Sequence, residues 1–236
     1  MTKRTGFLKA IALAAVGSLA LGASAQDKPE AAPKGNWTTM VTKTKGGHLL
    51  GNPEAKTKLV EFMSYTCSHC AHFAQEGDGA IKLVYVPTGK VSYEIRHLLR
   101  DPVDLTAAML THCGDAKKFP LNHQAFMSSH HEWMDKASKS TQAQRARWQF
   151  GSLGARLQAI ASDLDFYEIM ESRGYGRAEV DKCLTDEATA NEIAEASRAD
   201  VTTYQLRGTP SFVLDGQLLD GTHSWADLRP KLDGAL

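Results

Sequence analysis

The sequence predicts an α/β protein in which a βαβ unit and a ββα unit flank a long helical block. Three observations lead to this prediction. Residues 58–99 hold an apolar run of strand length, a proline-free helical stretch and a second, alternating strand. Helical spacing then dominates residues 101–207, and two strand-like runs follow Gly208. The 236 residues suffice for one or two domains with a buried core.

The composition is that of an ordinary globular protein, with 42% hydrophobic and 23% charged residues. These values exclude a disordered chain, a collagen and a coiled-coil rod. The 27 basic and 27 acidic residues balance, so the basic excess usual for nucleic-acid-binding proteins is missing and we expect no nucleic-acid partner. The four cysteines are too few for a disulfide-dense mini-scaffold.

Residues 1–25 have the pattern of a secretory signal peptide. A basic start precedes an apolar or small run at residues 10–21, and the tripeptide Ala-Ser-Ala at 23–25 predicts cleavage after Ala25. The alternative is a membrane anchor, but such a run is too short for a bilayer, which needs about 20 residues. No cysteine precedes Cys67, which excludes a lipid-modified cysteine at the cleavage site. We therefore expect an exported protein, with a net charge of −3 after cleavage, in a compartment where disulfides persist.

Residues 26–47 are predicted to be a lead-in with a possible first strand, and residues 48–100 to be the first part of the α/β domain. In this part we expect a strand at Lys58–Ser64, a helix that begins between Ser64 and Ser68 and continues to Leu83, a turn at Pro87–Lys90, and a strand in which Val91, Tyr93 and Ile95 alternate with polar residues. Strand, helix and strand in this order form a βαβ unit.

Residues 101–207 form the predicted helical block. Asp101 is placed to cap a helix that has Pro102 at its first position. Apolar residues between 153 and 167 recur at spacings of four and three, and a cap at Ser162 or Asp163 would divide them into two helices. The same spacing recurs between 190 and 204. The block has room for four or five helices.

Residues 208–236 form the second part of the α/β domain. Ser211–Leu214 and Gln217–Leu219 are joined by Asp215-Gly216, a strong signal for a type I′ hairpin. Ser224 caps a last helix, and Pro230 inside this helix is expected to kink or shorten it. A βαβ unit joined to a ββα unit is the thioredoxin fold, which we expect here with an inserted all-helical domain.

The chemistry is expected at Cys67-Ser68-His69-Cys70, where a strand gives way to a helix. The partial positive charge at a helix N-terminus stabilises a thiolate, and the pKa of Cys67 can fall from about 8.5 to about 3.5–7.5. Cys70 lies one turn further in, so the two sulfurs can cycle between dithiol and disulfide. An imidazole of His69 over the Cys67 sulfur would favour the thiolate further.

The run from Leu59 to Cys70 resembles the active-site strand and helix of the DsbA-type thiol:disulfide oxidoreductases, which are exported thioredoxin-fold proteins of the bacterial periplasm with a helical insertion. The resemblance covers nearly the whole chain after the signal peptide. It implies that His69 is the histidine of the redox motif and that Glu61 is the buried acid of the family. Ser68 departs from the family, in which many members have proline.

The resemblance extends to Gly208–Phe212, which is similar to the segment that holds the family's cis-proline opposite the redox pair. We therefore expect a cis bond between Thr209 and Pro210. The Thr209 backbone would then be free to pair with an extended substrate, and its hydroxyl could bond to the Cys67 sulfur. The resemblance also implies a structural disulfide between Cys113 and Cys183 in the inserted helices.

Several of these residues have simpler interpretations. Cys67 and Cys70 could be half of a zinc site with nearby histidines, although zinc sites usually need two such pairs. Glu61 could lie on an edge strand, and Cys113 and Cys183 could be separate buried thiols. We expect the remaining candidate side chains to be structural: His112, His123, His130 and His131 on a solvated helix surface, and Trp133 in the core.

We interpret the chain as a periplasmic protein-disulfide oxidoreductase that acts through a redox-active Cys67–Cys70 disulfide and needs neither an organic cofactor nor a metal. The resemblance implies two partners: newly exported polypeptides with free thiols, and a quinone-linked membrane reoxidant of DsbB type. We expect a monomer.

Two alternatives remain. One is a disulfide isomerase or reductase of the same fold, although such isomerases usually dimerise through an extra domain, for which the lead-in is too short. The other is a thioredoxin-like binding or chaperone module with purely structural cysteines, which an unreactive Cys67 would favour.

Overall fold

The computed structural model describes residues 1–2 and 35–236. The expected signal peptide and the first part of the lead-in therefore lie outside the described residues, except for Met1 and Thr2. In the described part of the chain, no helix is both long enough and apolar enough to cross a membrane.

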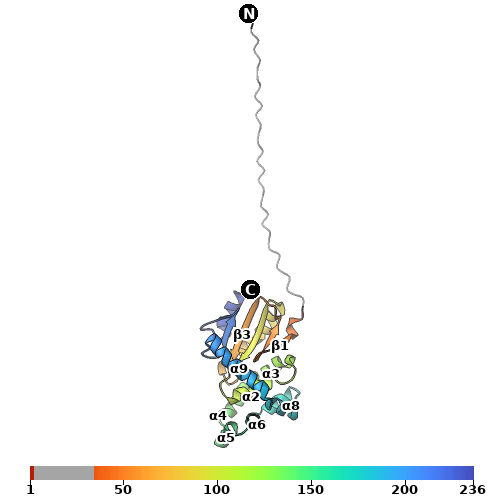
Figure 1. Ribbon diagram of the computed structural model, residues 1–236, viewed down its shortest axis with the longest axis vertical. Coiled ribbons are helices and arrows are strands. Elements are labelled where there is room, and N and C mark those ends of the chain that lie inside the picture. The colour runs from red at the N-terminus through yellow and green to blue at the C-terminus, as the bar shows by residue number, and fades with distance from the viewer. Residues whose placement is uncertain (3–34) are drawn as a thin grey trace. The chain divides into compact units, whose positions relative to one another are not determined.

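A six-stranded mixed sheet forms the centre of the fold (Figure 1). Its strands are β1 (Val41–Thr44), β2 (Gly47–Gly51), β3 (Thr57–Met63), β4 (Val91–His97), β5 (Ser211–Leu214) and β6 (Gln217–Leu218). They lie in the order β1-β2-β4-β3-β5-β6, and only β3 and β4 are parallel. β3 is therefore central, and Glu61 in it lies between Ile95 of β4 and Phe212 of β5.

A helical segment follows β3, as the sequence predicts, but it is irregular. It comprises α1 (Ser68–Phe73), two π-helical turns, η2 (Ala74–Asp78) and η3 (Ile81–Tyr85), and the 3₁₀ turn η4 (Val86–Thr88). The short 3₁₀ helix η1 (Trp37–Thr39) precedes β1. The wider π turns occur mostly as local features of α-helices, often at functional sites. The π turn η2 ends at Asp78, which is buried.

The helical block contains eight α-helices, so the expectation of four or five is wrong. They are α2 (Pro102–Thr111), α3 (Phe119–Ser128), α4 (His130–Ser138), α5 (Gln142–Gln149), α6 (Leu153–Asp163), α7 (Phe166–Ser172), α8 (Arg177–Leu184) and α9 (Glu187–Tyr204); a 3₁₀ turn, η5 (Ala116–Lys118), precedes α3. Glycines with positive φ at 114, 151 and 174 separate helices that apolar spacing alone does not divide.

The structure confirms one of the helix caps expected from the sequence and corrects another. The Asp101 carboxylate accepts from the Asp104 N–H and caps α2, as expected. The break between α6 and α7 is also confirmed, but Ser162 and Asp163 are not its cap. Both belong to the last turn of α6, and the chain turns instead through Asp165, whose φ is 59°.

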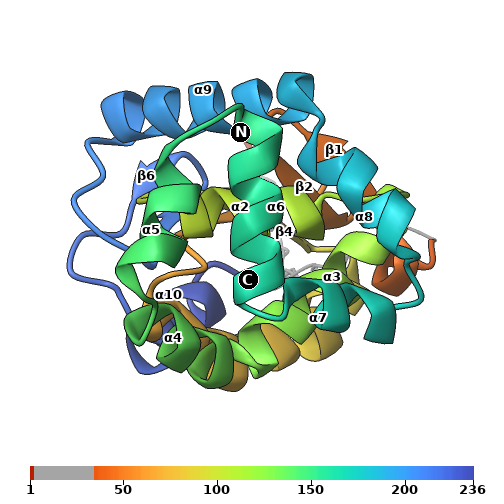
Figure 2. The same ribbon diagram turned by 90° about the horizontal axis from the view of Figure 1, so that it is seen from below.

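Two apolar layers cover the two faces of the sheet. Leu59 and Met63 of β3 pack with Phe73 of α1 and with Leu228 and Leu232 of α10 (Trp225–Asp233). On the other face, Phe62 packs with Val213 and Leu206 and against Tyr204, at the end of α9. Figure 2 shows α9 and α10 on opposite sides of the sheet. The central strand β3 is thus buried on both faces, and the cysteines that follow it are buried as well.

The C-terminal hairpin and helix also match the sequence. Asp215 and Gly216 have φ values of 49° and 84°, as a type I′ turn requires. The Ser224 hydroxyl accepts from the Asp227 N–H at the start of α10. Pro230 was expected to kink or shorten this helix; it does not end it, because α10 continues to Asp233 with Leu232 in the core.

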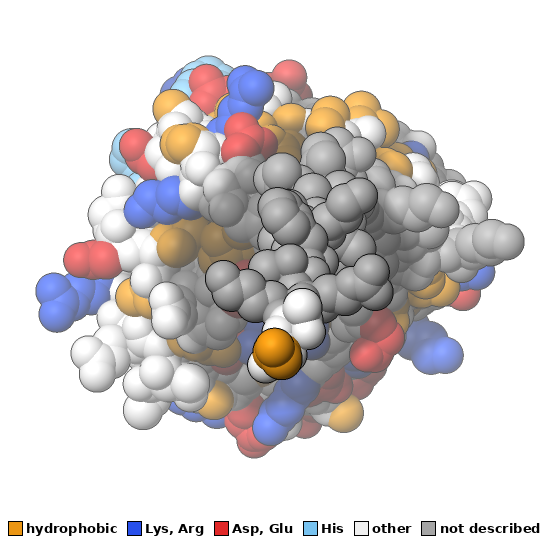
Figure 3. Space-filling model, turned by 90° about the horizontal axis from the view of Figure 1, so that it is seen from above, with side chains coloured by type: hydrophobic (Ala, Val, Ile, Leu, Met, Phe, Trp, Pro, Cys, Tyr) orange, Lys and Arg blue, Asp and Glu red, His pale blue; other side chains and the backbone are white. Residues whose placement is uncertain are grey.

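Acidic and basic side chains are interspersed with apolar ones on the face shown in Figure 3. This mixture agrees with the balanced charge of the chain.

Candidate active site

Cys67 and Cys70 lie where the chain leaves the central strand β3 and enters α1. Cys67 is the N-cap of α1, and its carbonyl accepts from the Ala71 N–H at 3.1 Å. Both cysteines are free thiols; Cys67 is 5% exposed and Cys70 1% exposed. The structure thus brings the two sulfurs together at a helix N-terminus, as the sequence predicts.

The two thiols have opposite acidities. Hydrogen bonds lower the pKa of Cys67 to about 4: the largest contribution comes from the Cys70 thiol, and the Thr209 hydroxyl and the backbone N–H groups of Cys70 and His69 contribute further, against the opposing effect of burial. Burial raises the pKa of Cys70 well above its ordinary value, and hydrogen bonding to Cys67 adds to this. At neutral pH the pair therefore holds one thiolate, on Cys67, and one proton, on Cys70.

His69 contributes to this asymmetry through its backbone. Its N–H is among the groups that lower the pKa of Cys67, whereas its imidazole is exposed.

The peptide bond between Thr209 and Pro210 is cis, as expected. The Thr209 carbonyl oxygen lies 3.2 Å from the Cys67 Sγ and accepts from the thiol in the protonated form. His223 Nδ1 lies 2.7 Å from the Pro210 carbonyl oxygen and connects this loop to the start of α10. The loop therefore faces Cys67 directly.

Asp104, which sequence reasoning did not select, holds the segment between β3 and Cys67. Its carboxylate accepts from the Ser64 hydroxyl at 2.6 Å, the Tyr65 N–H at 2.7 Å and the Arg100 N–H at 3.0 Å. Asp104 is fully buried, and burial raises its pKa to about 7. An acid at the third position of a helix looks like an ordinary helix-capping residue, so the sequence carries no signal of this contact.

Glu61 is buried in the central strand, at 3% exposure, which rules out the edge-strand interpretation, and it interacts electrostatically with both cysteines. Burial raises its pKa to about 8, with a further contribution from the charge of Asp78. The Tyr93 hydroxyl bonds to Glu61 Oε2 and lies 2.8 Å from Asp78 Oδ1. The sequence identified Glu61 but gave no reason to join it to Tyr93 and Asp78.

Cys113 and Cys183 form a disulfide, with Cα atoms 5.7 Å apart. It ties the chain just after α2 to α8, within the helical block. This disulfide has a structural role and does not involve Cys67 or Cys70. The alternative of two separate thiols is wrong.

The histidines that were expected on a solvated surface are mostly buried. His123 is 1% and His130 7% exposed, and His112 packs against His48 and His97; only His131 is exposed as expected. A neutral imidazole has apolar faces, and burial lowers the pKa of these rings so that they stay neutral. Trp133 lies in the core, as expected. Within residues 1–2 and 35–236, no three His, Cys, Asp or Glu side chains are placed to hold a metal ion.

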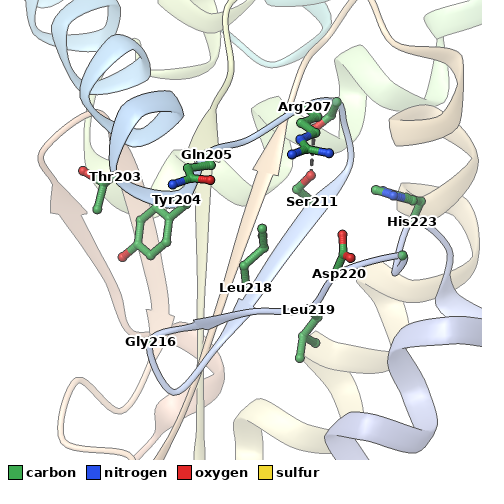
Figure 4. Close-up of a pocket in the computed structure, with 12 residues that line it drawn as sticks. Thr203, Tyr204, Gln205, Arg207, Ser211, Gly216, Leu218, Leu219, Asp220 and His223 are labelled. Carbon is green, nitrogen blue, oxygen red and sulfur yellow. Dashed lines mark hydrogen bonds between the residues drawn. The ribbon is translucent and has the colours of Figure 1, made fainter.

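Two surface hollows are lined by chain neighbours of Cys67 and of the cis-proline. The first, of about 510 Å³, lies between the end of α9 and the β5–β6 hairpin, beside the cis-proline loop. Arg207, Asp220 and His223 are among the side chains around it (Figure 4). The second, of about 470 Å³, is lined by Thr66, next to Cys67, and by Met134 and Trp148 of the helical block.

The chain is similar in sequence and fold to known proteins. The family model described as thioredoxin matches residues 43–234. The crystal structure of a protein-disulfide isomerase from Novosphingobium aromaticivorans is similar, with a TM-score of 0.77, 47% sequence identity, and coverage of 80% of this chain and 97% of that one. Alpha-DsbA1 of Wolbachia pipientis shares the fold, with a TM-score of 0.58 at 22% identity over 84% of this chain and 95% of that one.

Relatives from Rickettsia bellii and Rickettsia conorii carry the name protein-disulfide oxidoreductase. They are 27% and 28% identical over 169 and 190 residues, which are 71% and 80% of this chain. The matched part spans only 56% and 60% of those relatives. The family match, which covers most of the sequence, and the arrangement of sheet, helical insertion and cysteine pair together show that the chain belongs to the thioredoxin family, with the helical insertion of DsbA-type proteins.

Proposed function

We propose that this protein introduces disulfide bonds into exported polypeptides by thiol–disulfide exchange at Cys67. The observation that carries the proposal is the opposite acidity of two adjacent thiols: Cys67 is ionised at neutral pH and Cys70 is not. A thiolate is both the attacking and the leaving group in such exchange. The names of the Rickettsia and Novosphingobium relatives support the same reaction class.

The exchange takes two steps. A substrate thiolate attacks the Cys67 sulfur of the Cys67–Cys70 disulfide; a bond forms between the substrate and Cys67, and the electron pair of the broken bond goes to Cys70, which takes up a proton. A second substrate thiolate then attacks the substrate sulfur of this mixed disulfide and releases Cys67 as a thiolate. The substrate loses two electrons and the enzyme pair gains them, without a cofactor or metal.

The low pKa of Cys67 favours oxidation of the substrate. A stabilised thiolate stabilises the reduced enzyme, and a pair whose reduced form is stable is a strong oxidant. Cys67 is also the better leaving group of the two thiols, which speeds the second step.

Substrates are extended, unfolded polypeptides with free thiols. The Thr209 carbonyl accepts only from a protonated Cys67 thiol, so in the disulfide form it can pair with such a chain as an added strand. The hollows beside the cis-proline loop and beside Thr66 can accept its side chains. The reduced pair is reoxidised by a quinone-linked membrane partner of DsbB type, and the protein acts as a monomer in the periplasm. The proposed location rests on the signal-peptide pattern of residues 1–25.

Alkylation of the reduced protein from about pH 3 to about pH 9 tests the assignment of the nucleophile. We expect label on Cys67 first, with a rate that rises to half its maximum near pH 4. First labelling of Cys70, or a Cys67 rate that rises only above about pH 8, contradicts the proposal. A Cys67 that does not react at all would favour the binding-module alternative.

Glu61→Gln tests the role of the buried acid. Its carboxyl is placed to exchange a proton with the Cys70 thiol, with which it interacts electrostatically. The variant should fold, turn over more slowly and lose the inflection near pH 8 from the exchange rate. An unchanged pH profile would remove Glu61 from the mechanism.

A disulfide isomerase is the second candidate, because the Novosphingobium relative bears that name. The two activities separate in refolding assays. An oxidase forms disulfides in a reduced substrate without an added thiol, whereas an isomerase restores activity to a scrambled substrate and must be kept reduced. We expect the first activity to dominate.

A further inference from the structure

We propose that Tyr93 and Asp78 connect Glu61 to a hollow on the protein surface, and that this chain of side chains carries protons between the Cys67/Cys70 pair and solvent. The inference deepens the proposed function and rests on it.

The Tyr93 hydroxyl is the central link. It bonds to Glu61 Oε2 on one side and lies 2.8 Å from Asp78 Oδ1 on the other. Exposure is 3% for Glu61, 5% for Asp78 and 0% for Tyr93, so water cannot replace this link. A phenol hydroxyl both accepts and donates a hydrogen bond, which is what a relay between two carboxyl groups requires.

Asp78 lies at the solvent end. It lines a hollow of about 340 Å³ between the irregular helix after α1 and α3, together with Gln75, Lys82 and Gln124. Lys82 Nζ lies 2.7 Å from Asp78 Oδ2, and the Lys82 side chain is 22% exposed. The hydrogen-bonded chain therefore ends at a hollow to which water has access and which the cis-proline loop does not line.

His123 and Tyr65 form a side branch that has no exit. His123 Nε2 lies 3.3 Å from Asp78 Oδ2, and its Nδ1 lies 2.9 Å from the Tyr65 hydroxyl, which donates to Thr111 Oγ1 at 3.1 Å. Both rings are buried. They hold Asp78 in place but do not reach solvent.

The protonation of the two carboxyl groups suits a relay. Burial raises the pKa of Glu61 to about 8, so Glu61 holds a proton at neutral pH. Burial acts in the same direction on Asp78, but the charge of Lys82 and the hydrogen bond to His123 outweigh it and hold the pKa of Asp78 below its usual range. A proton donor thus faces the sulfurs, and a proton acceptor faces the solvent.

The proton movements balance with the sulfur chemistry. When the Cys67–Cys70 bond breaks, the Glu61 carboxyl gives its proton to the Cys70 sulfur. The Tyr93 hydroxyl gives its proton to Glu61, and a proton that enters from the hollow reaches Tyr93 through Asp78. When the pair is reoxidised, the same protons move in the opposite direction, and Cys70 returns its proton to Glu61 and so to solvent.

Tyr93→Phe is the direct test, because it keeps the buried ring and removes only the relay hydroxyl. The measured quantity is the single-turnover rate at which a dithiol peptide reduces the oxidised full-length protein, across pH and in H₂O and D₂O. We expect a rate about tenfold lower and a changed solvent isotope effect. The inflection that Glu61 gives near pH 8 should move to higher pH, because the Tyr93 hydroxyl lowers the pKa of Glu61. If Tyr93→Phe folds poorly, Asp78→Asn should also lower the rate and change the isotope effect, with the inflection moved to lower pH because the charge of Asp78 raises the pKa of Glu61.

Tyr85→Phe is the matched control. The Tyr85 hydroxyl also donates to a carboxylate, Asp233 Oδ1, but at a distance from the cysteines and outside the relay. It should leave the rate, pH profile and isotope effect as in the unmodified protein.

Two failures can be told apart. If the unmodified protein oxidises no dithiol, the proposed function fails. If it does, and Tyr93→Phe and Asp78→Asn retain its rate and isotope effect, the proton route alone is refuted.

Discussion

Thr209→Val removes one hydrogen bond to the Cys67 sulfur with little change in shape. The Thr209 hydroxyl is among the groups that lower the pKa of Cys67 to about 4. A hydrogen bond to a charged group contributes about 1.5–3 kcal/mol, and about 1.4 kcal/mol changes a pKa by one unit. We therefore expect the pKa of Cys67 to rise by about one to two units. The reduction potential should fall by about 30 to 60 mV, since the reduced form loses that stabilisation.

The assay is the ultraviolet absorbance of the thiolate during a pH titration of the reduced protein. Thr202→Val is the matched control, because the Thr202 hydroxyl lies on the exposed surface of α9 and donates to the Arg198 carbonyl at 3.1 Å. It should not move the midpoint. An unchanged midpoint in Thr209→Val would refute the claim that this hydroxyl stabilises the thiolate.

Two further predictions concern stability. Replacing Cys113 and Cys183 by alanine opens a loop whose ends are 70 residues apart. The free energy of unfolding should fall by at most about 4 kcal/mol, and the pKa of Cys67 should not change. Equal denaturation midpoints with and without the disulfide would contradict this. Burial lowers the pKa of His97 to about 3. Between about pH 6.5 and about pH 3 the unfolded chain therefore binds a proton at this histidine that the folded chain does not, so the free energy of unfolding decreases as the pH is lowered. His97→Gln should therefore lose about 2 kcal/mol less between pH 7 and pH 5 than the unmodified protein, as urea denaturation at both pH values would show, and an equal loss in both proteins would refute the assignment.

The site residues that the sequence predicts are those whose signals are local. The spacing of Cys67 and Cys70 after an apolar strand is enough to place them at a helix N-terminus. Asp215-Gly216 specifies a turn by its own backbone preferences. Glu61 could be predicted as buried because it lies in β3, which the expected fold places between two other strands, β4 and β5.

The residues that sequence reasoning missed reach the site through packing between distant segments. Asp104 contacts Tyr65 across 39 positions, and Asp78, at the end of a π-helical turn, meets Tyr93 across 15 positions. Asp78 and Lys82, four residues apart, look like an ordinary surface ion pair in the sequence. The face that a helix turns to the core also decides whether His123 is buried, and weakly amphipathic helices do not specify that face.

The central claim is that the low pKa of Cys67 makes the Cys67–Cys70 disulfide an oxidant. The most direct measurement is the equilibrium of this pair against glutathione redox buffers, read by thiol trapping on the full-length protein. We predict a reduction potential far above that of thioredoxin, which is about −270 mV, and closer to the value of about −120 mV that a strong disulfide oxidant shows. A potential at or below about −270 mV would contradict it.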